Sequence, residues 1–204
     1  MSSTDRRMLI VDAAIELVAA QGIRALTHRA IDTAMALAPG STSYYFRTKR
    51  ALLEAMVTHI TEVTRADFAT TFTELPPTDR PREVVLNDIA EGVGTWLDRM
   101  LAHRRAHLVV RYALTIELSA DPELHSRLVG SLFSQPRARE LFEHLDAEEP
   151  DTTAADFIAV IEGATFDRLA GARAALPAGT PASTAQLTGL LAAYLRGALP
   201  GRSP

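Results

Sequence analysis

The sequence contains no cysteine, which excludes a disulfide framework, a thiolate metal site and a cysteine nucleophile. It also lacks any run of about 18 apolar residues, so we expect no membrane-spanning helix. The first residues are polar and lead directly into an amphipathic pattern, and we therefore expect no secretory signal. The remaining composition, with 47% hydrophobic and 23% charged residues, is typical of a soluble globular protein. A cytoplasmic protein is the simplest interpretation.

The net charge of −4 is unevenly distributed along the chain. Residues 1–50 carry seven Lys/Arg and four Asp/Glu, whereas the remainder carries 14 Lys/Arg and 21 Asp/Glu. A basic N-terminal segment joined to an acidic remainder suits a protein that meets phosphate at one end only. Asymmetries of this size are common, so this one favours nucleic-acid binding without establishing it.

Apolar residues recur at the helical period along almost the whole chain. In the first segment, five of them have the spacing of one helix face: Ile10, Ala13, Ala14, Leu17 and Val18. Further helices are expected at about residues 27–35, 39–46 and 48–72, after Pro81, at 106–118, from Pro122 with a bend or break at Pro136, and from Thr153 and Ser183. We find no internal repeat and no convincing strand. The sequence therefore predicts an all-α fold of about nine helices.

The second and third predicted helices are short and joined by a turn. Such a pair, following a first helix, allows its second member to enter the major groove of DNA while its first member crosses the backbone. Ile31 and Leu37 are expected to face inward and hold the two helices together. The predicted division is a helix-turn-helix head at residues 5–50, with its motif at about 27–46, and a helical body for effector binding and dimerisation at residues 51–200.

Several side chains of this motif suit contacts to DNA. A helix N-terminus, where amides and the helix dipole favour a phosphate, carries Thr27, His28 and Arg29. Small or hydrogen-bonding residues, which base edges and phosphates require, follow at Gly40, Ser41, Thr42, Ser43 and Tyr44. Lys49 lies just beyond them and has a charge suited to a backbone phosphate.

This segment resembles the tetracycline-repressor (TetR) family of transcriptional regulators. The resemblance covers about residues 6–60 without insertion or deletion. It is carried by Ile10, Ala13, Ala14, Leu17, Gly22, Thr27, Ile31, Gly40, Tyr45, Phe46, Lys49, Leu52 and Leu53. Beyond this segment only the architecture agrees, with long helices of which the final two usually form a dimer bundle in this family.

The resemblance implies a role for individual residues. Thr27 and Arg29 would contact phosphates, the base-facing start of the recognition helix would contain Pro39, Gly40 and Ser43, and the DNA backbone would be clamped by Ser41, Tyr45 and Lys49. Phe46 would close the core of the head, whereas Tyr45 fits packing as well as phosphate contact. The sequence departs from the usual pattern at Asp32 (usually a small residue), Ala36 (usually glycine), Ala38 (usually a capping serine) and Ser43 (frequently tyrosine).

Large or charged side chains of the body either line an effector cavity or pack as an ordinary core. The candidate lining residues are Trp96, Met100, Arg111, Tyr112, Phe133 and Phe166. Arg111 lies in the nearly all-apolar segment 106–118, where a charge must be paired, solvated or directed at a ligand. Both a carboxylate partner and an acidic ligand fit this position.

The last two predicted helices carry apolar stripes that either bury within the monomer or form a four-helix bundle across a dimer. Their place at the end of the chain favours the dimer, and Gly163 permits close approach of two helices. The predicted interface consists of Phe157, Ile161, Gly163, Leu187, Leu191, Tyr194 and Leu195.

The sequence thus predicts a homodimeric transcriptional repressor that is released from a partly palindromic double-stranded operator by a small-molecule effector. An activator, or a regulator controlled by a protein partner, is the alternative within the same class. A helical enzyme using His103 and His107 is a rival from another class, because their i, i+4 spacing can ligate a metal. No nucleophile motif, glycine-rich phosphate loop or further ligand accompanies them, so we expect no catalytic residue, no metal and no cofactor.

Overall fold

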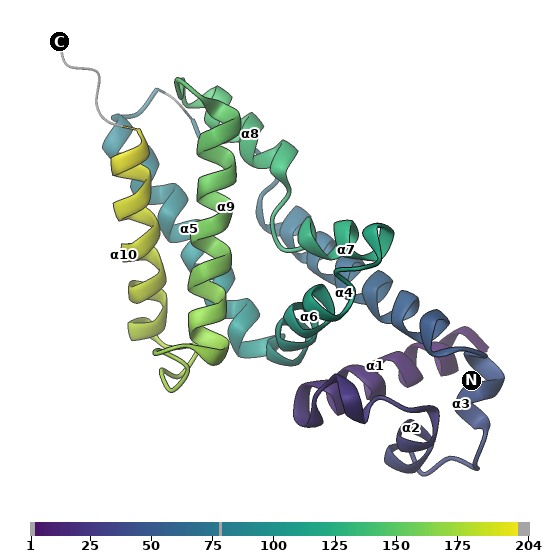
Figure 1. Cartoon of the computed structure of the whole chain (residues 1–204). Helices are drawn as coiled ribbons and strands as arrows, with labels where there is room; N and C mark the ends of the chain where they lie inside the picture. Colours follow the sequence, from purple (N-terminus) through teal and green to yellow (C-terminus); the bar gives the residue numbers. More distant parts are fainter. Residues whose placement is uncertain (1–2, 78, 200–204) are drawn as a thin grey trace. The chain divides into compact units, whose positions relative to one another are not determined.

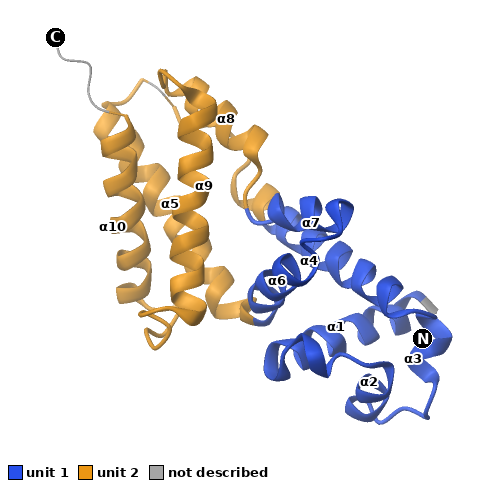
Figure 2. Ribbon diagram, in the orientation of Figure 1, with its two compact units in different colours: residues 1–67, 106–132 blue, residues 68–105, 133–204 orange. Residues whose placement is uncertain are grey.

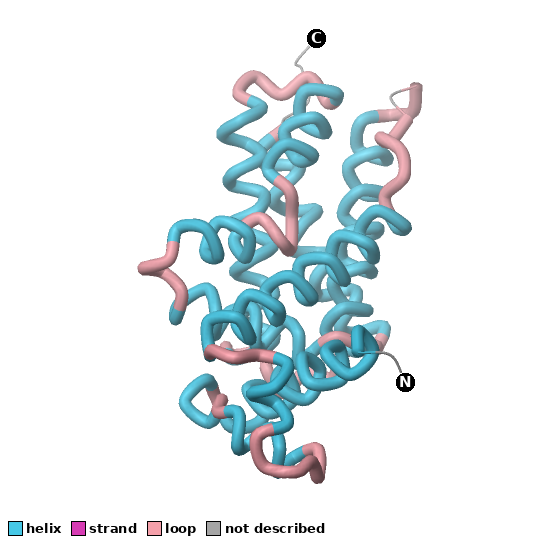
Figure 3. Tube along the Cα trace, turned by 90° about the vertical axis from the view of Figure 1, so that its right-hand side faces the viewer, coloured by secondary structure: helices cyan, strands magenta, loops and turns pink. Residues whose placement is uncertain are grey.

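The computed structural model describes residues 3–77 and 79–199. Within these ranges the chain forms ten α-helices and one 3-10 helix, and no strand (Figures 1 and 3). The elements are α1 (Ser3–Gln21), η1 (Ile23–Ala25), α2 (His28–Ala34), α3 (Ser41–Tyr45), α4 (Lys49–Thr71), α5 (Arg82–His103), α6 (Arg105–Glu117), α7 (Pro122–Val129), α8 (Gln135–His144), α9 (Pro150–Ala170) and α10 (Pro181–Ala198). The all-α prediction is confirmed. The expected break near Pro136 separates α7 from α8, and this proline lies in the first turn of α8, where a missing N–H is tolerated.

The chain divides into two compact units (Figure 2). The first contains the described residues of 1–67 together with 106–132, and the second contains 68–105 together with the described residues of 133–204. This division differs from the expected boundary after residue 50, because most of α4 and the helices α6 and α7 pack with the N-terminal head. None of the described helices is both long and apolar enough to cross a membrane.

The core of the first unit is apolar and continuous. Its most deeply buried members from α1 to α4 include Ile10, Ala14, Ile15, Leu26, Ile31, Phe46, Met56 and Val57. Phe46 is 1% exposed, which confirms its predicted place in the core. Leu114 of α6 and Leu128 of α7 belong to the same cluster and are each fully buried. The helix-turn-helix is therefore held by a core that extends into α6 and α7.

In the second unit, α10 packs along α5 and beside α9, and α8 packs on α9 (Figure 1). A buried polar cluster fixes the turn between α9 and α10. The Arg168 guanidinium donates to Ser183 Oγ at 2.6 Å and to the Leu176 carbonyl at 2.7 Å. Asp98 of α5 accepts from the Ser183 hydroxyl and, at 3.0 Å, from the Gly179 amide. These bonds give partners to the buried Asp98 carboxylate and to both terminal nitrogens of the Arg168 guanidinium, while Arg168 Nε is buried without a hydrogen-bond partner among the described residues. Without such partners, either buried charge would destabilise the fold.

Candidate functional site

Helix α2 begins where the sequence predicts. Thr27 is its N-cap, and the Thr27 hydroxyl accepts from the Ala30 amide at 3.1 Å. Arg29 is exposed in the first turn, as a phosphate contact requires. His28 is only half-exposed, and its Nε2 is buried without a hydrogen-bond partner among the described residues. The ring of His28 is therefore directed partly into the head, which weakens its predicted role as a DNA contact.

The turn after α2 depends on two residues with positive φ. Ala36 has φ 52°, a left-handed conformation that glycine adopts more easily, which is consistent with the glycine usual at this position. Gly40 has φ 91° and is the residue directly before α3. Pro39 therefore lies in the turn, and α3 begins at Ser41, two residues later than expected from Pro39. The prediction that Pro39 and Gly40 start the recognition helix is wrong by this shift.

Asp32 of α2 caps α3 from across the turn. Its side chain is 4% exposed and accepts three hydrogen bonds, from the Gly40 amide at 2.8 Å, the Thr42 amide at 2.8 Å and the Thr42 hydroxyl at 2.6 Å. Burial by itself raises the pKa of Asp32, but these hydrogen bonds favour the ionised form and hold its pKa below the ordinary value. The sequence marked Asp32 only as a departure, although the missing cap at Ala38 was a signal that another residue supplies it.

The two outward side chains of α3 are Ser43 and Tyr44, and Tyr44 is 81% exposed. Ser41 is half-buried and donates to the Ala38 carbonyl at 2.6 Å. Thr42 is fully buried and bonded to Asp32, which corrects the prediction that its side chain contacts DNA. Tyr45 is half-buried beside Tyr44, with ring centroids 5.1 Å apart in an edge-to-face arrangement. The surface of α3 that a base edge can reach is therefore narrow.

Positive side chains near α3 differ in what they contact. Lys49 and Arg47 are exposed next to the start of α4. Arg7 of α1 instead donates to the Tyr45 carbonyl at 2.7 Å and lies over the Phe46 ring at 4.4 Å from its centroid. Arg7 thus stabilises the end of α3, whereas Lys49 and Arg47 are placed where a phosphate can reach them.

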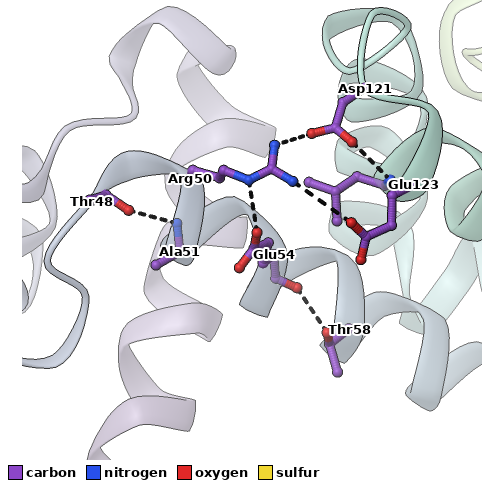
Figure 4. Close-up of polar contacts among 8 residues, drawn as sticks. Thr48, Arg50, Ala51, Glu54, Thr58, Asp121 and Glu123 are labelled. Atoms are coloured by element: carbon purple, nitrogen blue, oxygen red, sulfur yellow. Dashed lines mark hydrogen bonds and ion pairs between the residues drawn. The ribbon is translucent and has the colours of Figure 1, made fainter.

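Arg50, adjacent to Lys49, belongs to an ion-pair cluster that links α4 to α7 (Figure 4). It contacts Asp121, lies 2.9 Å from Glu54 and reaches Glu123 at 4.0 Å. The hydrogen bond from Arg50 is the main cause that lowers the pKa of Asp121. Asp121 also caps α7 by accepting from the Leu124 amide at 3.3 Å. This cluster fixes the start of α4 within the first unit.

The second unit contains a cavity of about 340 Å³, a volume suited to a small molecule. Its lining is mainly apolar and aromatic: Phe68, Phe72, Leu75, Pro76, Ile89, Gly92, Val93, Phe133, Ala138 and Leu141, with Thr71, Glu74, Asp88 and Arg137. Trp96 does not line the cavity but packs edge-to-face on Phe68, Phe72 and Phe133, with centroid distances of 5.6, 6.1 and 6.0 Å. Of the six predicted lining residues, Phe133 alone lines this cavity.

The other predicted lining residues have different surroundings. Met100 is 2% exposed in the core, and Phe166 is 48% exposed on α9. Arg111 and Tyr112 belong to the first unit. Arg111 donates to the Leu128 carbonyl at 3.2 Å, to Ser131 Oγ at 2.8 Å and to the Val129 carbonyl at 3.2 Å. Recognition of an acidic ligand by Arg111 is therefore wrong, because backbone carbonyls and a hydroxyl accept from its guanidinium.

Five of the seven residues predicted at a dimer interface are fully buried within the second unit itself: Phe157, Ile161, Leu187, Leu191 and Leu195. The apolar stripe of α10 packs on α5 of the same chain, so its predicted contact with a second subunit is wrong. Gly163 is exposed. Tyr194 is half-buried, and its hydroxyl donates to the Thr153 carbonyl at 2.9 Å.

The described residues contain no group of three or more His, Asp or Glu side chains arranged to hold a metal ion. His107, which the sequence offered together with His103 as a possible metal ligand, lies beside His59, with ring centroids 5.5 Å apart. His103 belongs to the other unit. The geometry of the first unit, with two short crossed helices and an outward α3, is that of a helix-turn-helix DNA-binding protein.

Comparison with known families agrees with this class. Residues 10–56 match the bacterial regulatory proteins of the tetR family, and residues 86–200 match the tetracyclin repressor-like C-terminal domain. The chain belongs to the TetR family of DNA-binding transcriptional regulators, which are not enzymes. No curated protein matches the chain.

Solved structures share the fold over most of the chain. A TetR-family member from Streptomyces coelicolor A3 is 24% identical, with a TM-score of 0.63 over 91% of this chain and 97% of that chain. A transcriptional regulator from Rhodococcus sp. Rha1 is 15% identical, with a TM-score of 0.71 over 94% and 97%. The multidrug binding protein EbrR, solved in complex with malachite green, is 25% identical, with a TM-score of 0.60 over 91% and 97%.

Proposed function

We propose that this regulator is a homodimeric cytoplasmic repressor that leaves a partly palindromic operator when a small aromatic molecule enters the cavity of the second unit. The observation that carries the proposal is the outward presentation of Ser43 and Tyr44 on α3 beside exposed cations. A small molecule that binds one conformation of the protein more tightly than another shifts the population toward that conformation. Release of the operator therefore requires a small molecule that prefers the conformation with the weaker affinity for DNA.

In this proposal Ser43 and Tyr44 contact base edges, while Thr27, Arg29 and Lys49 contact phosphates. The first probe is a duplex that the protein itself selects from a random-sequence library. Arg29→Ala and Lys49→Ala should each weaken binding and reduce the salt slope, log K against log salt, by about 1, because each loses one phosphate contact. Arg65→Ala, which removes an exposed cation from α4 outside the motif, is the matched control. Unchanged affinity and slope in both motif variants would refute these contacts.

The dimer interface that we propose is the outward face of α9 and α10. It carries the exposed apolar side chains Phe166 and Leu190, at 48% and 40% exposure, among small residues. Gly163 and Gly189 have open space where a Cβ would lie, which allows a second pair of helices to approach closely. Sedimentation should give twice the chain mass of 22.1 kDa for the wild type and the monomer mass for Leu190→Glu. Ile116→Glu, at a 74% exposed position on α6, should remain dimeric.

The effector that we propose is a planar aromatic molecule, because three phenylalanine rings and few polar groups line the cavity. Malachite green is a suitable first probe, since EbrR was solved with it. Its binding should quench the fluorescence of Trp96, the only tryptophan of the chain, because Trp96 packs on phenylalanine rings that line the cavity. Ile89→Phe should reduce the affinity by filling the cavity, whereas Ile116→Phe, outside the lining, should not. A cavity that binds no aromatic probe would favour control by a protein partner.

Repression and activation both begin with binding to the operator. A reporter gene placed behind the selected duplex distinguishes them. Reduced expression in the presence of the protein, restored by a ligand that binds the cavity, supports the repressor. Increased expression would refute it and leave the DNA-binding role intact.

A further inference from the structure

Asp32 is a buried carboxylate that accepts hydrogen bonds from the first turn of the next helix and from the residue directly before it, rather than pairing with a Lys or Arg. A carboxylate at 4% exposure is unfavourable unless donors compensate it. Here the donors are the amides of Gly40 and Thr42 and the Thr42 hydroxyl, all within 2.8 Å. The Asp32 carboxylate of α2 thus stabilises the beginning of α3 through these hydrogen bonds.

Helix α3 has no cap of its own. Gly40, directly before it, has no side chain, and no side-chain bond caps the helix from that position. Five residues are too few for a helix to be stable in isolation, because nucleation is unfavourable. The direction of α3 must therefore be set by its neighbours, and Asp32 is the neighbour that bonds to its first turn.

We propose that Asp32 is a positioning residue for DNA recognition: it fixes the first turn of α3 so that Ser43 and Tyr44 face the duplex. This rests on the proposed contact of α3 with base edges. Because the Gly40 and Thr42 amides already donate to a carboxylate, a phosphate does not bind to them. The negative charge of Asp32 also disfavours a phosphate at this helix start. Asp32 therefore increases discrimination between sequences rather than overall affinity.

The main experiment uses the double variant Asp32→Ala/Thr42→Leu in the full chain. Replacing both side-chain partners by apolar groups avoids leaving one of them buried without a bond. Dissociation constants are measured at one salt concentration for the selected duplex and for a scrambled duplex of the same composition. We expect the ratio of the two constants to fall at least tenfold, with binding to the scrambled duplex unchanged or tighter.

Glu16→Ala is the matched control, because it removes one negative charge from an exposed position on α1 of the same unit. Its ratio should equal that of the wild type. Circular dichroism and a melting curve establish that the double variant is folded at the assay temperature. A folded double variant whose ratio stays within twofold of the wild type would overturn the proposal, since a merely structural role leaves the ratio unchanged once folding is complete.

Asp32→Asn provides a second and milder test. Its amide oxygen still accepts from Thr42, but its NH₂ group opposes the Gly40 amide, so the ratio should lie between those of the wild type and the double variant. If the double variant does not fold, the Asp32→Asn variant provides the test. A ratio of dissociation constants equal to that of the wild type would then overturn the proposal. The double variant Ser43→Ala/Tyr44→Ala tests the proposed contact of α3 with base edges separately from the role of Asp32. An unchanged ratio in this variant would refute base reading by α3, and the positioning role of Asp32 would then be refuted as well.

Discussion

Two glycines of α5, two residues apart, are expected to respond to alanine in opposite directions. At Gly94 an added Cβ would lie 2.6 Å from Thr188 Oγ1 and 2.9 Å from the Thr188 amide nitrogen of α10. At Gly92 the nearest atom is Cε1 of Phe72, at 3.6 Å, which is ordinary van der Waals contact. Both substitutions remove glycine from a helix interior, and by itself this stabilises the fold by about 1 kcal/mol.

The magnitudes follow from these contacts. At Gly94 the obstructing atoms include backbone, so α10 has to move away from α5. Because backbone atoms obstruct the new Cβ, we expect the upper part of the range for overpacking, about 2–3 kcal/mol. Subtracting the helix-propensity gain of about 1 kcal/mol leaves a net destabilisation of about 1–2 kcal/mol. Gly92→Ala should stabilise by about 0.5–1 kcal/mol. For a chain of 204 residues, 1 kcal/mol shifts Tm by about 2–4 °C. Gly94→Ala should therefore lower Tm by about 2–8 °C, while Gly92→Ala raises it.

The assay is thermal unfolding followed by circular dichroism, with urea unfolding as a check. All variants are compared at one protein concentration, because the proposed dimerisation would make Tm concentration-dependent. Thr188→Ala in the Gly94→Ala background removes the closest of the clashing atoms and should recover part of the loss. A Gly94→Ala protein as stable as the wild type would refute the close approach of α5 and α10.

Four further substitutions test the first unit. The folded-state pKa of Asp32 is lowered, so its ionised form stabilises the fold at neutral pH, and this stabilisation is lost as pH falls through the folded pKa. The stability difference between wild type and Asp32→Asn in urea should be constant from about pH 8 to 5 and shrink below about pH 4. Ala36→Gly should raise stability by about 0.5–1 kcal/mol by relieving a left-handed alanine, whereas Gly40→Ala should lower it. Arg111→Met should lower the free energy of unfolding by about 1.5–3 kcal/mol, because the Leu128 and Val129 carbonyls lose the guanidinium that donates to them.

The head was predictable from the sequence because its information is local. Apolar spacing and the Thr27 cap each act within a few residues, and both agree with the structure. The start of α3 does not, because Gly40 takes a left-handed conformation before the helix instead of opening it. The motif also has a fixed length, so the resemblance assigns each position a place in space. Exposure within α3 was not predictable to the same degree, because Thr42 has the composition of a surface residue and becomes buried by bonding to Asp32.

The body was less predictable because an apolar stripe shows that a helix face is buried and not which segment covers it. The stripe at Leu187, Leu191 and Leu195 is equally consistent with a second subunit and with α5, about 90 residues earlier in the chain. The structure selects α5. Likewise, Arg111 in an apolar segment indicated a carboxylate partner or an acidic ligand, but backbone carbonyls have no sequence signature and were not foreseen as its acceptors.

The departures of the motif from its family are connected by one physical requirement, which is to hold α3 at a fixed angle to α2. Ala38 provides no capping hydroxyl, and Asp32 provides a carboxylate instead from the preceding helix. Thr42 then has to be polar to bond that carboxylate, since a buried charge facing an apolar side chain would be unfavourable. The backbone of the turn keeps its left-handed residue at position 36 even though alanine occupies it. Because this arrangement directs Thr42 inward, Ser43 and Tyr44 are the side chains of α3 that we propose for sequence reading. A change of either residue should alter which duplex the protein selects more than how tightly it binds DNA in general.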